Sequence, residues 1–257
     1  MASDPSWKKI FEDYKIYDHD FDLAPFRITA EQIKRACQDF TETGQKEVRI
    51  LCKQDSREDR PEVFVDRNLF LLPVTNGEYA IVRGEGYVDI PEIENAQEVY
   101  TSRLDFTLDT SLVGNSEMQH LDFAYASSLI RNFMNDESLV LTIRGRKYTP
   151  RFSLRVGRHS ISVKGVQTEV DAGYEGRNQV VLVEAKPGTA RNLIIRQLYY
   201  PFRQWQTHTA KRVVTLFFEK VADVYSIWQF RFNEVENYNA IELVRAGKFQ
   251  IISGSRW

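Results

Sequence analysis

The residue types that could do chemistry together stand at the ends of two neighbouring strand-like segments. Glu184 and Lys186 end the run VVLVEAK at 180–186. Because alternate side chains of a strand share one face, both project to the same side. Asp171 ends the strand-like segment before it. If the two segments pair as a hairpin through residues 173–179, Asp171 and Glu184 converge at one end of a sheet, with Lys186 beside them.

Carboxylates gathered at one point form an oxygen-rich site of the kind that Mg²⁺ occupies together with water and a substrate phosphate. A neighbouring ammonium could orient or deprotonate the attacking water and stabilise charge that builds on phosphorus. Glu169 lies on the same strand face as Asp171 and competes with it for the role of first acid. The alternative is an exposed, ion-paired strand face, which contributes roughly 0 to 1 kcal/mol to stability. The context favours chemistry, because the apolar residues 180–183 lead directly into Glu184.

The charges of the chain are distributed unevenly. The whole chain carries 34 basic and 36 acidic residues, a net charge of −2. Residues 1–143 hold 15 basic against 27 acidic residues, whereas residues 144–212 hold 14 against 4. Such a localised basic segment can bind a polyanion, and RNA, an acidic protein or the chain's own N-terminal carboxylates are alternatives to DNA. We expect double-stranded DNA, with backbone contacts from Arg144, Arg146, Lys147, Arg151, Arg158 and Lys164.

The N-terminal third has the pattern of a mixed α and β region. Near-helical apolar spacing predicts a helix over 28–40, with Thr29 as its N-cap. Alternation predicts strands at 47–53, 68–73 and 79–83, and Asn76-Gly77 is typical of a hairpin turn between the last two. We expect residues 1–100 to form an N-terminal α+β region that serves DNA recognition or dimerisation.

The rest of the chain, 101–257, is expected to form the catalytic domain. The order of its elements is helix, several strands, helix, strand, which predicts an α/β (α+β) fold with a central mixed sheet flanked by helices. The expected helices are 117–134, which begins with the capping box Ser116 and Gln119, and 189–206, with a kink at Pro201. The expected strands are 139–143, 151–156, 161–171, 180–186, 213–219, 224–232 and 240–252.

This order of elements, with Asp171 on one strand and Glu184-Ala185-Lys186 on the next, resembles the PD-(D/E)XK nuclease superfamily and its type II restriction endonucleases. The resemblance covers roughly 115–220 and implies a restriction-endonuclease-like core. It implies that Asp171 and Glu184 are the metal-binding acids and that Lys186 is the catalytic lysine. Members often take another carboxylate from the helix before the sheet, and Glu117 is the candidate here. Val170 stands where the family pattern has proline.

The function implied is that of a Mg²⁺-dependent type II restriction endonuclease that cuts double-stranded DNA at a specific, palindromic site. One active site cuts one strand, so symmetric cleavage implies a two-fold homodimer. The alternatives are a repair or recombination nuclease of the same superfamily and a non-catalytic DNA-binding protein that retains the fold.

Other chemistries and environments lack support in the sequence. The four histidines are scattered without metal-ligand spacing, and no GxxxxGK[ST] loop occurs, so neither zinc hydrolysis nor an ATP-driven step is expected. Short apolar runs and a charged N-terminus argue against a membrane span or signal peptide. Cys37 and Cys52 lack CxxC spacing, so we expect reduced thiols in a cytoplasmic protein.

Overall fold

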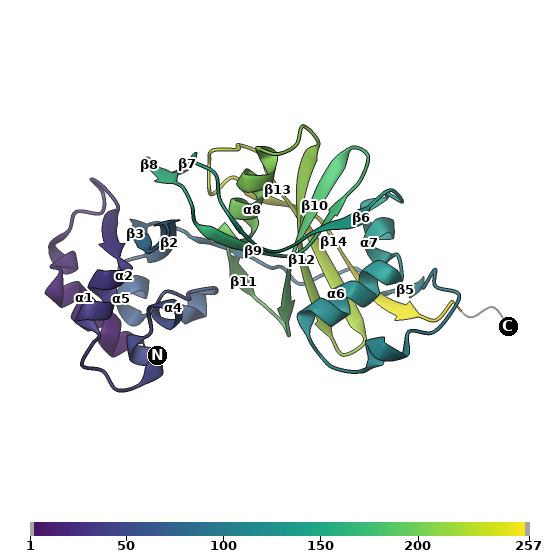
Figure 1. Ribbon diagram of the computed structural model, residues 1–257, viewed down its shortest axis with the longest axis horizontal. Coiled ribbons are helices and arrows are strands. Elements are labelled where there is room, and N and C mark those ends of the chain that lie inside the picture. Colours follow the sequence, from purple (N-terminus) through teal and green to yellow (C-terminus); the bar gives the residue numbers. More distant parts are fainter. Residues whose placement is uncertain (1–2, 255–257) are drawn as a thin grey trace.

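The computed structural model describes residues 3–254, which form two lobes (Figure 1). Each lobe has a hydrophobic cluster of its own, and a third cluster is shared by both. The N-terminal lobe, residues 3–83, closes around a core that includes the fully buried Trp7, Phe11 and Phe64. Its helices are α1 (Asp4–Asp13), η1 (Ile16–Asp18), α2 (Ala30–Ala36), α3 (Thr43–Lys46), α4 (Val48–Leu51), η2 (Arg57–Asp59) and α5 (Glu62–Val65), and its strands are β1 (Phe26–Thr29), β2 (Leu69–Thr75) and β3 (Glu78–Arg83).

The local signals of the N-terminal lobe are confirmed in part. Thr29 caps α2 in a capping box with Gln32, and β2 and β3 form the predicted hairpin, with Gly77 at a φ of +78° in its turn. The predicted strand at 47–53 is wrong, because this segment forms α4. The amides of Leu51 and Cys52 donate to carbonyl groups four residues earlier, and Leu51 alone of the helix is buried. Alternation over so short a segment cannot tell a strand from one helical turn that buries a single residue.

The C-terminal lobe, residues 84–254, is built on a large mixed sheet, which confirms the predicted fold class at this level. Its helices are η3 (Asp109–Leu112), α6 (Glu117–Ala126), α7 (Leu129–Met134) and α8 (Arg196–Gln206). Its strands are β4 (Tyr87–Asp89), β5 (Glu98–Thr101), β6 (Val140–Tyr148), β7 (Phe152–Val156), β8 (His159–Val163), β9 (Gln167–Glu175), β10 (Gln179–Pro187), β11 (Asn192–Ile194), β12 (Arg212–Val221), β13 (Val224–Phe232) and β14 (Ile241–Ile252).

The seven strands of this sheet lie in the order β5-β14-β13-β12-β10-β9-β6. β10 pairs in parallel with β12, and β14 with β5, while the other neighbours are antiparallel. Helices α6 and α7 pack on one face, over Val181, Val183 and Leu216. Helix α8 packs on the other face, where the side chains of Glu184 and Lys186 also lie because they alternate with Val183 and Ala185.

Three elements that were predicted as continuous are each two separate elements in the structure. The predicted helix 117–134 is α6 and α7, separated at Ser128, whose φ is +68°. The predicted strand 161–171 is split between β8, which pairs with β7 in a separate hairpin, and β9 in the large sheet. The predicted helix 189–206 begins only at Arg196, because residues 192–194 form β11 and pair with β4, about a hundred residues earlier. Such a distant partner leaves no trace in local periodicity.

The two lobes share a hydrophobic core. Phe70 and Leu72 of β2 belong to the same buried cluster as Ile161 of β8 and Tyr199 of α8. The β7-β8 hairpin also touches the N-terminal lobe through its backbone, since the amide of Lys164 donates to the carbonyl of Val74 at 3.0 Å. Within residues 3–254, no helix is both long and apolar enough to cross a lipid bilayer.

Candidate active site

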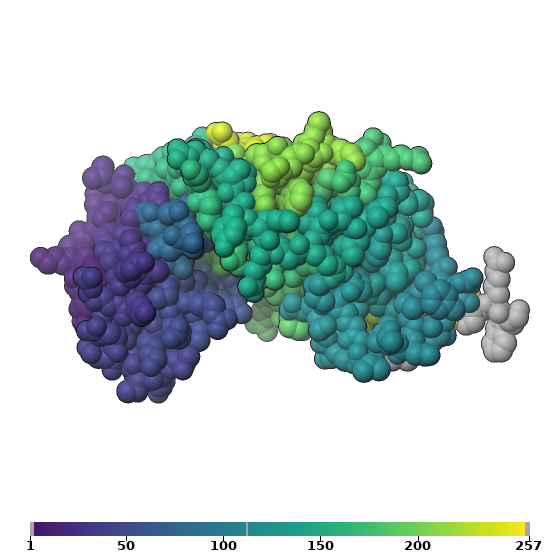
Figure 2. Space-filling view, in the orientation of Figure 1, coloured from purple at the N-terminus to yellow at the C-terminus, as the bar shows by residue number. Residues whose placement is uncertain are grey.

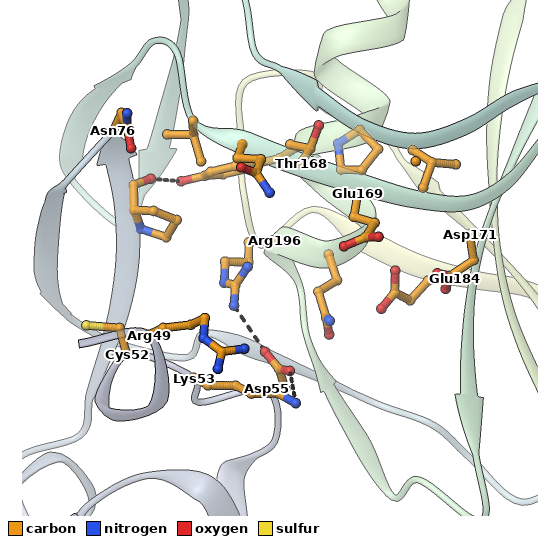
Figure 3. A pocket seen from close by; sticks show the side chains of 18 of the residues that line it. Arg49, Cys52, Lys53, Asp55, Asn76, Thr168, Glu169, Asp171, Glu184 and Arg196 are labelled. Carbon is orange, nitrogen blue, oxygen red and sulfur yellow. Dashed lines mark hydrogen bonds and ion pairs between the residues drawn. The ribbon is translucent and has the colours of Figure 1, made fainter. Parts of the chain in front are cut away.

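The pairing of β9 with β10 brings the two predicted acids together. Val183 lies opposite Ala172, and the next step of this register places Glu184 opposite Asp171. The amide of Ala185 donates to Oδ2 of Asp171 at 2.8 Å, which holds the aspartate against β10. Opposed residues of a pair of strands share a face. Figure 3 shows the two carboxylates side by side at the edge of a cleft, as the hairpin argument predicts.

An irregularity in β9 adjusts the position of Asp171. Ile143 of β6 pairs with Gly173, but Gly145 pairs with Val170, so the register shifts beside Asp171. Bulges of this kind re-aim side chains and are common near active sites. Gly173 permits the close approach of Ile143 on β6, because a Cβ at position 173 would lie 2.6 Å from the Cβ of Ile143.

Lys186 completes the group. Its Nζ lies 2.7 Å from Oε1 of Glu184, whose side chain is buried at the base of the cleft. Burial raises the pKa of Glu184 to about 7, with Lys186 opposing this shift and the nearby Asp171 adding to it. Burial also raises the pKa of Asp171, against the effect of the Ala185 amide. The pKa of Lys186 is raised, because the carboxylates of Glu184, Asp55 and Asp171 outweigh the opposing effect of its burial.

Glu117 and Glu169, the two other acids considered for the metal site, also line the cleft but differ in their surroundings. Glu117, the first residue of α6, lines the same cleft, and burial and the proximity of Asp171 raise its pKa while Lys186 opposes the shift. Glu169 is exposed, and its Oε2 lies 3.3 Å from Nε of Arg146. Asp171 rather than Glu169 therefore takes the place opposite Glu184.

The donor set suits a hard, partly hydrated cation. Within residues 3–254, no three His, Cys, Asp or Glu side chains converge into a ready-made metal cage. Mg²⁺ is usually bound by one or two carboxylates, with water and substrate phosphate as its other ligands. Asp171 and Glu184 supply two adjacent carboxylates, and burial raises the pKa of both. A divalent cation would favour their ionised forms.

The site opens into a cleft of about 900 Å³ between the two lobes. Figure 2 shows the hollow at the lower edge, between the blue N-terminal lobe and the teal part of the C-terminal lobe. The N-terminal wall brings in Arg49, Lys53 and Asp55, and α8 adds Arg196. No sequence pattern predicted these four residues. Residues 1–143 are acidic as a whole, so the segment gave no reason to single out Arg49 and Lys53. No local pattern predicts that these two cations lie near β10.

The six basic residues expected to contact DNA lie outside this cleft. None of these six described residues lines it, although Gly145, between two of them, does. Arg144 is ion-paired with Asp122, and Arg158 with Asp22 at 3.3 Å. Lys147, Arg151 and Lys164 are exposed on β6 and around the β7-β8 hairpin. Contact with DNA through these residues stays a prediction.

Two family models together cover most of the chain. Residues 82–250 match a family described as a domain of unknown function (DUF6997), and the chain belongs to this family. Residues 4–81 match a second domain of unknown function (DUF6996). The two models meet within β3, at residues 81 and 82. The strands that follow, β4 and β5, pair with β11 and β14 of the C-terminal lobe. No curated protein and no solved structure matches the chain.

Proposed function

We propose that the chain is a Mg²⁺-dependent endonuclease that hydrolyses phosphodiester bonds in double-stranded DNA. The observation that carries the proposal is the juxtaposition of Asp171 and Glu184 on paired strands, with Lys186 bonded to Glu184, at the base of a cleft. A structural ion pair would not require a second carboxylate facing the same buried point. When both carboxylates are ionised, Lys186 balances only one of the two charges, and a bound cation would balance the other.

Each residue of the group has a defined role in this proposal. Asp171 and Glu184 would hold Mg²⁺, which as a Lewis acid lowers the pKa of water and polarises a phosphoryl oxygen. The Lys186 ammonium, 2.7 Å from Glu184, would orient the attacking water and stabilise negative charge on the phosphate. Glu117, which lines the same cleft, would contribute through water.

The arrangement of the elements supports a restriction-endonuclease-like core. The chain runs from α6 and α7 through the antiparallel β6, β9 and β10, then through α8 to β12, which lies parallel to β10. This is the order of the PD-(D/E)XK superfamily that the sequence resembles. We extend the proposal to a type II restriction enzyme that acts as a homodimer on a palindromic site, since each chain carries one such group.

Digestion of phage DNA by the purified chain with Mg²⁺, followed by mapping of the fragment ends, tests this function. Discrete fragments would support site-specific restriction, whereas a smear would favour a repair, recombination or nonspecific nuclease. Binding of DNA without any cleavage would contradict the enzyme and favour the non-catalytic alternative.

Lys186→Ala separates catalysis from binding. We expect cleavage to fall by about 100-fold or more, as for loss of a group that stabilises charge in the transition state, while duplex binding is retained. Lys211→Ala is the matched control, because Lys211 pairs with Glu175 at the other end of the same strands. Equal cleavage by wild type and Lys186→Ala would contradict the assigned role.

A further inference from the structure

Two cations of the N-terminal lobe face the carboxylate group across the cleft. Arg49 lies on α4 and Lys53 follows that helix, and both side chains reach into the cleft in Figure 3. The Lys53 side chain is 72% exposed, and its Nζ is 3.9 Å from Asp55, the limit of an ion pair. Arg49 is exposed, and no ion pair or hydrogen bond of its guanidinium occurs within residues 3–254. Both charges are therefore available to an external anion.

The position of these cations relative to the site is set by contacts between the lobes. Asp55 accepts from Nη2 of Arg196 at 3.0 Å, and its carbonyl accepts from the amide of Ile194 at 2.9 Å. A little further along, the amide of Arg57 donates to Oδ1 of Asn192 at 2.6 Å. The loop that carries Lys53 is thus docked on β11 and on the start of α8, a few residues after Lys186.

Ordinary surface charge does not account for this placement. The N-terminal lobe is acidic, and solvated lysines and arginines could lie anywhere on it, yet these two project into the cleft that contains Asp171 and Glu184. A DNA duplex carries a phosphate charge about every 1.7 Å along its axis, so a strand cut at Asp171 and Glu184 presents further phosphates to the walls of the cleft. Lysine and arginine contacts of this kind position the backbone without reading sequence.

We propose that Arg49 and Lys53 bind the phosphodiester backbone of the DNA, so that the substrate lies between the two lobes rather than only along residues 144–164. This inference rests on the proposed function, and it assigns the N-terminal lobe a direct share of the substrate-binding surface.

Duplex binding in a salt series, without Mg²⁺, tests the assignment by the fluorescence anisotropy of a labelled DNA. For the double variant Arg49→Ala with Lys53→Ala, we expect affinity to fall at least about tenfold and the slope of log K against log salt to decrease by about 2. The matched control is Lys34→Ala with Arg35→Ala, two exposed cations of α2 in the same lobe but outside the cleft, which should bind as wild type does. Thermal unfolding of each variant confirms that it is folded.

The outcomes separate this inference from the function on which it rests. If wild type binds duplex DNA and the Arg49 and Lys53 variant binds equally well with the same salt slope, the inference is overturned and the function stands. A wild-type chain that binds no duplex DNA, or prefers single-stranded RNA in competition, overturns both. Loss of binding in the α2 control to the same extent would also overturn the inference, because any cation of the lobe would then matter equally.

Discussion

Two glutamates are buried on the same face of the large sheet, and only one belongs to the candidate site. Glu219 of β12 lies beside Lys186 in the register, is 3% exposed, and accepts from the amide of Ala190 at 2.6 Å. Burial raises the pKa of Glu219 from 4.5 to about 7, against the effect of that amide. Between pH 4.5 and about 7, Glu219 therefore keeps its proton in the folded state and loses it in the unfolded state. The contribution of Glu219 to stability falls as the pH rises through this range and is constant above it.

Glu219→Gln should remove this share of the pH dependence. The glutamine oxygen can still accept from Ala190 but carries no charge, so the variant should gain up to about 3 kcal/mol over wild type at pH 8 and little near pH 4.5. Urea unfolding at both pH values measures the difference, with the exposed Glu94→Gln as a control. A variant whose advantage over wild type is the same at pH 4.5 and pH 8 would show that Glu219 is not the group responsible.

At the residue scale, a site residue could be predicted where residues close to it in the sequence determine its position. Asp171, Glu184 and Lys186 were placed together correctly because strand alternation and one short hairpin determine their faces. Asp55 and Arg49 could not be placed, since their approach to the site depends on the docking of α4 and the following loop against β11. The side chains of Asp55 and Arg196 meet across 141 residues, a separation at which no sequence spacing predicts a contact.

At the element scale, the close pairing of β6 with β9 controls where Asp171 lies. Gly173→Ala would place a methyl group 2.6 Å from the Cβ of Ile143, an atom fixed to the backbone of β6. We expect a loss of about 1 to 3 kcal/mol in the free energy of unfolding, as for other overpacked sites, and reduced cleavage because Asp171 shifts. Gly44→Ala is the control, since a Cβ there meets nothing within 4 Å. Wild-type stability and activity in Gly173→Ala would contradict this role of the close pairing.

The elements themselves were predicted well where the pattern was long and regular. Strands β10, β12, β13 and β14 were located closely from apolar runs and alternation. Failures came where one local pattern is compatible with two structures, as in α4, or where tertiary pairing overrides propensity, as in β11. Ser128 breaks the helix between α6 and α7 with a backbone conformation that no sequence signal marks.

At the scale of the whole molecule, Arg57 ties the lobes together near the cleft. Its guanidinium pairs with Glu85, which precedes β4, and with Asp89, the last residue of β4, both in the C-terminal lobe. Arg57→Ala should lower the free energy of unfolding by about 1 kcal/mol, as expected for a partly exposed pair. It should also increase proteolysis between the lobes, whereas the exposed Arg177→Ala should do neither. Unchanged proteolysis in Arg57→Ala would mean that the Arg57 ion pairs do not hold the lobes together.

The most direct test of the central claim is calorimetric titration of Mn²⁺, as a substitute for Mg²⁺, into the wild-type chain and three variants. We predict one site in wild type, weakened at least about tenfold in Asp171→Asn and in Glu184→Gln because each removes one charged ligand. Glu169→Gln should bind as wild type does, since Glu169 faces Arg146. Absence of a site in wild type, or equal binding by Glu184→Gln, would contradict the claim that Asp171 and Glu184 hold one divalent cation.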